Sequence, residues 1–355
     1  LQFTTTGVRK WATYYGGSRE CYGTSIFSDG KDVWVTGYAF AVDFPTFNPG
    51  GGAFYQGSLE ELCRFGYGNA FILKFTTSGI CEWSTYYGNC DDWGASIYSN
   101  GTNVWIAGNT SSINFPTQDP GGGAYFQGTP GSSTNNGDYI FILQFDTACV
   151  RKWATYYGDG GGGGDQANCI QSDGTSVWVT GYTESKNFPT FNPGNGAYYQ
   201  DTLAATFYSS NAFILQFSNT GVRKWATYYG GSGSKFGGNS DEGLSIYSDS
   251  INVWVSGITG STNFPTLNPG NGAYFQDSIG GTVVRRNSFI LQFSTNGVRK
   301  WATYYGGAGN VNGAGDFANS INSDRKNVWV CGWAGSLNLP LLDPGGGAFF
   351  EDTTD

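Results

Sequence analysis

Residues 83–88 read Trp-Ser-Thr-Tyr-Tyr-Gly, and this hexapeptide returns along the chain at a nearly constant interval. As Trp-Ala-Thr-Tyr-Tyr-Gly it begins at Trp11, Trp153, Trp225 and Trp301. Successive copies lie 72, 70, 72 and 76 residues apart. A fixed period of this length indicates a repeat architecture in which every unit is one supersecondary structure.

Two further blocks keep the same order within each repeat. The first is Val-Trp-(Val/Ile), centred on Trp34, Trp105, Trp178, Trp254 and Trp329. The second is Phe-Ile-Leu-(Gln/Lys)-Phe, starting at Phe71, Phe141, Phe213 and Phe289, with a shortened copy at Leu1, Gln2 and Phe3. These blocks are β-branched and aromatic and are bounded by Gly, Asn and Asp, which is typical of short strands joined by tight turns.

The composition agrees with an all-β chain. Of the 355 residues, 57 are Gly and 17% are aromatic, whereas only 13% are charged. Gly disfavours long helices, and disordered chains are poor in aromatic residues. The absence of His excludes Ser–His–Asp catalysis and His-ligated zinc.

Charge and hydropathy limit the classes of partner. A net charge of −9 disfavours nucleic acid, which requires a basic surface. No apolar run approaches the ~20 residues of a membrane-spanning helix, so we expect no membrane insertion. Because the chain contains no Met, we expect Leu1 to follow processing or to lie within a longer polypeptide.

Four strands per repeat predict a β-propeller of four-stranded blades. We expect a single five-bladed domain with repeats at about 17–88, 89–158, 159–230, 231–306 and 307–355, the last joined by 1–16. The chain opens with the last two strands of a repeat and finishes with the first two. Residues 1–16 are therefore expected to complete the blade begun at 318–332, which would close the ring and remove exposed strand edges.

These blocks resemble the bacterial SBBP-type β-propeller repeat family. The resemblance rests on Val-Trp-Val-Thr-Gly at 33–37, Asp-Phe-Pro-Thr at 43–46, Asn-Ala-Phe-Ile-Leu-Lys-Phe at 69–75 and the hexapeptide at 83–88, and it covers essentially the whole chain. It implies a secreted or surface-exposed bacterial propeller. It carries over no catalytic residue, because the family has none in common.

A loop motif follows the second strand of each repeat. It reads Phe-Pro-Thr-x-(Asn/Asp)-Pro-Gly-(Gly/Asn)-Gly-Ala and ends in two aromatic residues. The pairs are Phe54/Tyr55, Tyr125/Phe126, Tyr198/Tyr199, Tyr274/Phe275 and Phe349/Phe350. Strand order predicts that these loops share one face, where the rings could stack on sugars or on an apolar partner. In the alternative interpretation, the rings pack on the blade and hold down their own loop.

An Asp enters the innermost strand of four repeats: Asp92, Asp165, Asp241 and Asp316. We expect these carboxylates to surround the mouth of a central channel. They could hold a cation such as Ca²⁺ or act as an acid/base pair in glycoside chemistry. Alternatively, each accepts backbone N–H bonds at a blade junction.

The cysteine count of seven is odd. Repeat alignment places Cys21, Cys63 and Cys90 on the long-loop face near the first blade. We expect at most one disulfide there, involving Cys63.

The leading functional hypothesis is a secreted or cell-surface module that binds or scaffolds without catalysis. It would present its loop-rich aromatic face to glycans, to a surface protein in adhesion, or to copies of itself. Repeated equivalent sites suit such multivalent attachment. The alternatives are a structural subunit of an extracellular filament or surface layer, and a glycoside hydrolase or lyase that uses the channel-mouth carboxylates.

Overall fold

The computed structural model describes residues 1–59, 68–131, 137–160, 164–206, 209–233, 240–280, 286–308 and 315–352. They fall into two compact units, Leu1–Tyr157 and Gly158–Asp355. Both units are built from antiparallel strands, and the described part of the chain contains no helix. It accordingly has no helix of the length and hydropathy needed to cross a bilayer.

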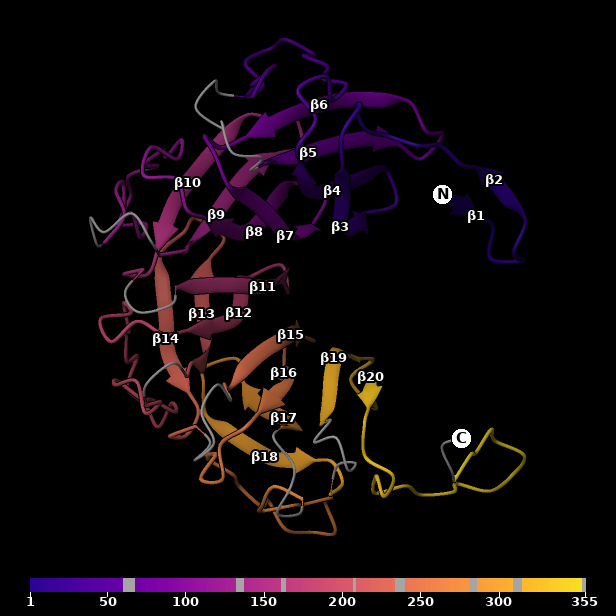
Figure 1. The fold of residues 1–355 in the computed structure, drawn as a ribbon, viewed down its shortest axis with the longest axis vertical. Helices are drawn as coiled ribbons and strands as arrows, with labels where there is room; N and C mark the ends of the chain where they lie inside the picture. Colours follow the sequence, from indigo (N-terminus) through magenta and orange to yellow (C-terminus); the bar gives the residue numbers. More distant parts are fainter. Residues whose placement is uncertain are drawn as a thin grey trace. The chain divides into compact units, whose positions relative to one another are not determined.

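The first unit contains two four-stranded sheets, ordered β3-β4-β5-β6 and β7-β8-β9-β10, and the pair β1-β2 (Figure 1). The pair consists of β1 (Gln2–Phe3) and β2 (Arg9–Trp11). The sheets consist of β3 (Cys21–Ser28), β4 (Asp32–Ala39), β5 (Asn69–Thr76), β6 (Cys81–Tyr87), β7 (Asp92–Ser99), β8 (Asn103–Thr110), β9 (Tyr139–Asp146) and β10 (Arg151–Tyr157).

The second unit contains two more four-stranded sheets, ordered β11-β12-β13-β14 and β15-β16-β17-β18, and the pair β19-β20. The sheets consist of β11 (Asp165–Ser172), β12 (Ser176–Thr183), β13 (Asn211–Ser218), β14 (Arg223–Tyr229), β15 (Glu242–Ser248), β16 (Asn252–Thr259), β17 (Asn287–Ser294) and β18 (Arg299–Tyr305). The pair consists of β19 (Asp316–Ser323) and β20 (Val328–Ala334). The all-β class and the four strands per repeat are thereby confirmed.

Equivalent residues pair in the same register in each complete sheet. The central Trp of the second strand lies opposite the Lys or Gln of the third, as in Trp34↔Lys74 and Trp254↔Gln292. Gln292 in turn lies opposite Trp301 of the fourth strand. Gln2 lies opposite Trp11 in the same way, so β1 and β2 have the register of the third and fourth strands of a repeat.

Neighbouring sheets within a unit stack face to face, since strands that are apolar on both faces need cover on both. In the first unit, Trp34 of one sheet enters the same buried cluster as Phe141 of the next. In the second unit, Trp178 and Phe289 meet in the equivalent way. Each junction thus buries the repeated motifs of two adjacent sheets.

The loop motif lies along the outer strand of its own sheet. Phe47 forms an isolated antiparallel bridge with Ser84 of β6, and Phe191 forms the same bridge with Ala226 of β14. Further along the loop, the Tyr86 N–H donates to the Gln56 carbonyl at 3.1 Å. The loop therefore lies against the sheet of its own repeat, as in the interpretation in which the rings hold down their own loop. The loop covers the outer edge, which would otherwise be open to pairing with another chain.

Candidate functional site

In four of the five loop pairs, the first ring packs on the last Tyr of its own hexapeptide, whereas Phe349 of the fifth pair is 91% exposed. Ring centroids are 4.7 Å apart for Phe54–Tyr87, Tyr125–Tyr157 and Tyr198–Tyr229, and 5.3 Å apart for Tyr274–Tyr305. The Trp that opens the hexapeptide donates its indole N–H to the carbonyl of the same loop residue, as Trp83 does to Phe54 at 2.8 Å. These rings anchor the loop to the sheet.

The second ring of the pair is exposed in three loops, those of Tyr55, Phe126 and Phe350. Tyr55 and Phe126 are each 39% exposed. Tyr199 and Phe275 in the second unit are half-buried. The Tyr55 hydroxyl lies 2.9 Å from Thr46 Oγ1, which fixes the ring without covering it. In Phe54/Tyr55 the two interpretations of the motif therefore apply to different rings, whereas in Tyr274/Phe275 it is the first ring that is the more exposed, at 40%.

One of the exposed rings borders a groove, which we call the Arg151 groove. Its volume is about 530 Å³, and it is lined by Phe54, Tyr55, Gln56, Gly88, Asn89, Asn114, Pro116 and Arg151. The lining combines an aromatic face with amide side chains and one guanidinium. Such a combination offers both stacking and hydrogen bonding to a polyhydroxylated ligand.

Arg151 is held firmly at the floor of this groove. Its guanidinium carbon lies 4.9 Å from the centre of the Phe54 ring. Nε donates to Gln118 Oε1 at 2.8 Å, and Nη1 donates to Tyr87 Oη at 2.9 Å and to the Pro116 carbonyl at 3.1 Å. The sequence identifies the Tyr of this groove; it also places the pair Arg151-Lys152 just before the outermost strand, where we expect a solvated rim, with binding of acidic glycans as the alternative.

The second unit repeats this arrangement with other residues. The Arg299 guanidinium lies 4.9 Å from the Tyr198 ring centre. Its Nη1 donates to Tyr229 Oη at 3.1 Å and to the Pro265 carbonyl at 3.2 Å. The same geometry therefore occurs at one sheet junction in each unit.

The four recurrent carboxylates Asp92, Asp165, Asp241 and Asp316 are 0–1% exposed, whereas the sequence placed them at an open channel mouth. Asp165 is surrounded by donors: the N–H groups of Asp159 and Gly160 at 2.9 and 3.0 Å, and the hydroxyls of Ser185 and Thr183. Asp241 accepts from the Gly231 N–H at 2.8 Å. This environment matches the interpretation of these groups as acceptors at a blade junction.

Burial raises the pKa of Asp92, Asp165 and Asp241 in spite of their hydrogen bonds. The pKa of Asp92 rises to about 8, and those of Asp165 and Asp241 rise to about 6. No group of three or more His, Cys, Asp or Glu residues that could hold a metal ion occurs within the described ranges. The Ca²⁺ expectation stays a prediction.

Of the disulfide candidates, Cys63 lies outside the described residues. Cys21 is a free thiol in the described structure. The Cys90 N–H donates to Ser112 Oγ at 2.8 Å, which ties the start of β7 to the loop after β8.

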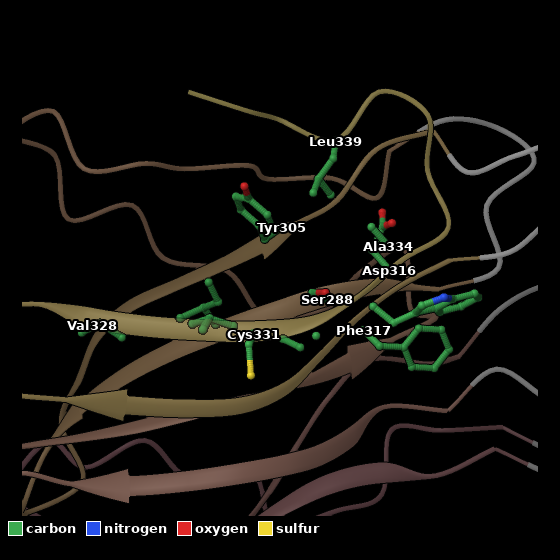
Figure 2. A pocket seen from close by; sticks show the side chains of 13 residues that line it. Ser288, Tyr305, Asp316, Phe317, Val328, Cys331, Ala334 and Leu339 are labelled. Carbon is green, nitrogen blue, oxygen red and sulfur yellow. The ribbon is translucent and has the colours of Figure 1, made fainter. Parts of the chain in front are cut away.

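A slot lies beside the strand pair at the end of the second unit (Figure 2). Its volume is about 360 Å³, and Ile290, Tyr305, Val330 and Leu339 are among its lining residues. Trp329 of β20 is 53% exposed, whereas the equivalent Trp254 of the preceding sheet is 8% exposed. Among the described residues, β20 pairs with β19 alone, whereas the second strand of each complete sheet of this unit also pairs with a third strand.

In the first unit, residues 11–18 contact the first sheet as a fourth strand would. Tyr15 Oη donates to the Pro45 carbonyl at 2.8 Å, and the Ser18 N–H donates to Asp43 Oδ1 at 2.8 Å. Between the complete sheets of the second unit, Tyr229 and Ser232 make the same two bonds, to Pro265 and Asn263. The N-terminal segment therefore carries the docking contacts of a blade's outermost strand.

Sequence reasoning missed one further aromatic cluster. Tyr38 stacks on Tyr22 and Trp93, with centroids 4.9 and 5.2 Å apart. These residues do not recur in every repeat, so no periodic signal marks them. A scan of the chain against protein-family models finds no matching family, and a search of curated proteins finds no similar sequence.

Proposed function

We propose that this protein is a secreted or cell-surface bacterial module that binds glycans without catalysis. The Arg151 groove carries the proposal, because an exposed Tyr face, amide groups and a fixed guanidinium meet there along the edge of a rigid sheet. The second copy around Arg299 favours multivalent attachment, in which weak sites combine into strong avidity. The resemblance to SBBP-type propeller repeats supports the same extracellular setting.

Our proposal for the whole fold is a five-bladed propeller in which β1 and β2 complete the sheet begun by β19 and β20. In the register of the complete sheets, Leu1 and Phe3 would take the places of Leu291 and Phe293, which are buried in the core. Leu1 and Phe3 are 73% and 54% exposed in the described structure. Pairing would bury this apolar surface together with the slot beside β20.

A panel of immobilised glycans tests the binding function. We expect the wild-type protein to bind at least one glycan class, and the double variant Tyr55→Ala/Tyr199→Ala to bind it at least tenfold more weakly. Tyr22→Ala is the control, since it removes a ring of similar exposure outside both sites. Absence of binding to every glycan, or equal binding by the double variant, would contradict the proposal.

A further inference from the structure

We infer that the Arg151 groove and the equivalent Arg299 site, where Arg299 contacts Tyr198, Tyr229 and Pro265, select glycans that carry a carboxylate, that is, uronic-acid sugars. This inference rests on the proposed glycan-binding function and adds the ligand class to it. It starts from the charge of the two guanidiniums, which form no ion pair with a carboxylate of the described residues.

Every acceptor that the two guanidiniums reach among the described residues is neutral: a Gln oxygen, Tyr hydroxyls and Pro carbonyls. The ion pairs of the described residues instead involve Lys74, Lys152 and Arg286. Two half-buried positive charges therefore lack counter-charges in a chain whose net charge is −9. Such a charge favours an anionic ligand over a neutral one.

The sheet junction itself does not require an arginine. In the first sheet, Cys81 occupies the position equivalent to Arg151. The junction there still forms, because Tyr15 Oη donates to the Pro45 carbonyl just as Tyr87 Oη donates to the Pro116 carbonyl. A role for Arg151 in ligand binding explains why a charged residue stands where an uncharged one suffices for the fold.

The rest of the Arg151 groove fits a sugar that carries such a charge. Nη2 of Arg151 donates to none of the described residues, so it remains available to a carboxylate oxygen. The Asn114 amide is exposed and makes no hydrogen bond within the described structure, whereas the equivalent Asn263 accepts the Ser232 N–H at 2.9 Å. The Tyr55 ring then provides a stacking surface at the same groove.

Titration calorimetry with two matched probes tests the inference. The probes are an oligogalacturonate and its methyl ester, which share one sugar skeleton and differ in charge. We expect the acid to bind at least tenfold more tightly at low salt, with the difference shrinking as salt is added. Arg151→Gln/Arg299→Gln should lower affinity for the acid to that for the ester.

Lys152→Gln/Lys300→Gln is the control, because these lysines neighbour the two arginines and have other partners, Asp146 and Asn252. Near-UV circular dichroism checks that each variant is folded. Equal affinity for acid and ester, or full acid affinity in the arginine variant, overturns the inference but leaves glycan binding intact. If the folded wild-type protein binds neither probe nor any glycan of the panel, the proposed function fails as well.

Discussion

Single polar atoms inside the sheets decide how each loop is held. Tyr156 is fully buried, and its hydroxyl donates to the Ser112 carbonyl at 2.6 Å while accepting the Phe115 N–H at 2.8 Å. The other complete sheets repeat this bridge, for example through Tyr228. The hexapeptide therefore specifies both a strand and the anchor of the loop beside it.

Tyr156→Phe is expected to lower the free energy of unfolding by about 2–4 kcal/mol, because it leaves a buried N–H and a buried carbonyl without partners. Urea unfolding followed by tryptophan fluorescence measures the loss. Tyr55→Phe removes a hydroxyl at the surface and should cost less than about 1 kcal/mol. Equal costs for the two changes would show that the buried bridge does not stabilise the sheet.

The buried carboxyls predict an unusual pH dependence. In the folded state, the pKa is about 8 for Asp92 and about 6 for Asp165 and Asp241. These values lie above the pKa of an unfolded Asp, which is about 4. The folded protein thus binds more protons between pH 4 and 8, and its stability should increase as the pH falls through this range. We expect a melting temperature several degrees higher at pH 5 than at pH 8. A steady rise of the melting temperature from pH 5 to 8 would contradict this.

At the scale of elements, each sheet is protected along its outer edge by its own loop. The Gln200 N–H donates to Thr227 Oγ1 at 2.8 Å, and the Tyr228 N–H donates to the Gln200 carbonyl at 3.2 Å. Equivalent bonds join Gln56 to Thr85 in the first unit. The loop thus acts as an additional edge segment that satisfies backbone groups of the outer strand.

Thr227→Val keeps the shape of this buried side chain but leaves the Gln200 N–H without its acceptor. We expect a loss of about 1–3 kcal/mol and faster hydrogen exchange across residues 188–200, because the loop then opens more readily. Hydrogen exchange followed by mass spectrometry measures the opening of the loop. The exposed Thr220→Val is the control. Unchanged exchange in the loop would mean that this bond does not hold it.

The repeated features could be predicted from sequence because the same residue types recur at equivalent positions in five copies. The strands, their order and the two-strand fragments at each end all follow from the hexapeptide and the blocks around Trp34 and Phe71. The course of the loop stayed open between two interpretations, since Pro and Gly specify a turn but not whether it folds against the sheet. The Arg151 groove was missed because its lining comes from two neighbouring sheets.

At the scale of the whole molecule, the central claim is that β1 and β2 complete the last sheet. Two observations support this proposal: β1 and β2 keep the register of third and fourth strands, and Trp329 of β20 is exposed in the strand pair that lines the slot. Closure within one chain removes an edge that would otherwise recruit a second copy. The glycan sites would then be distributed over one rigid scaffold.

Hydrogen exchange of the monomeric protein, resolved by residue, tests closure most directly. We predict that the β20 amides facing the slot exchange as slowly as those of β16, because β1 pairs with them. Slow exchange that appears only when the protein dimerises would assign the pairing to a second copy. Fast exchange in β20 beside a protected β16 would contradict the claim that β1 and β2 complete the last sheet.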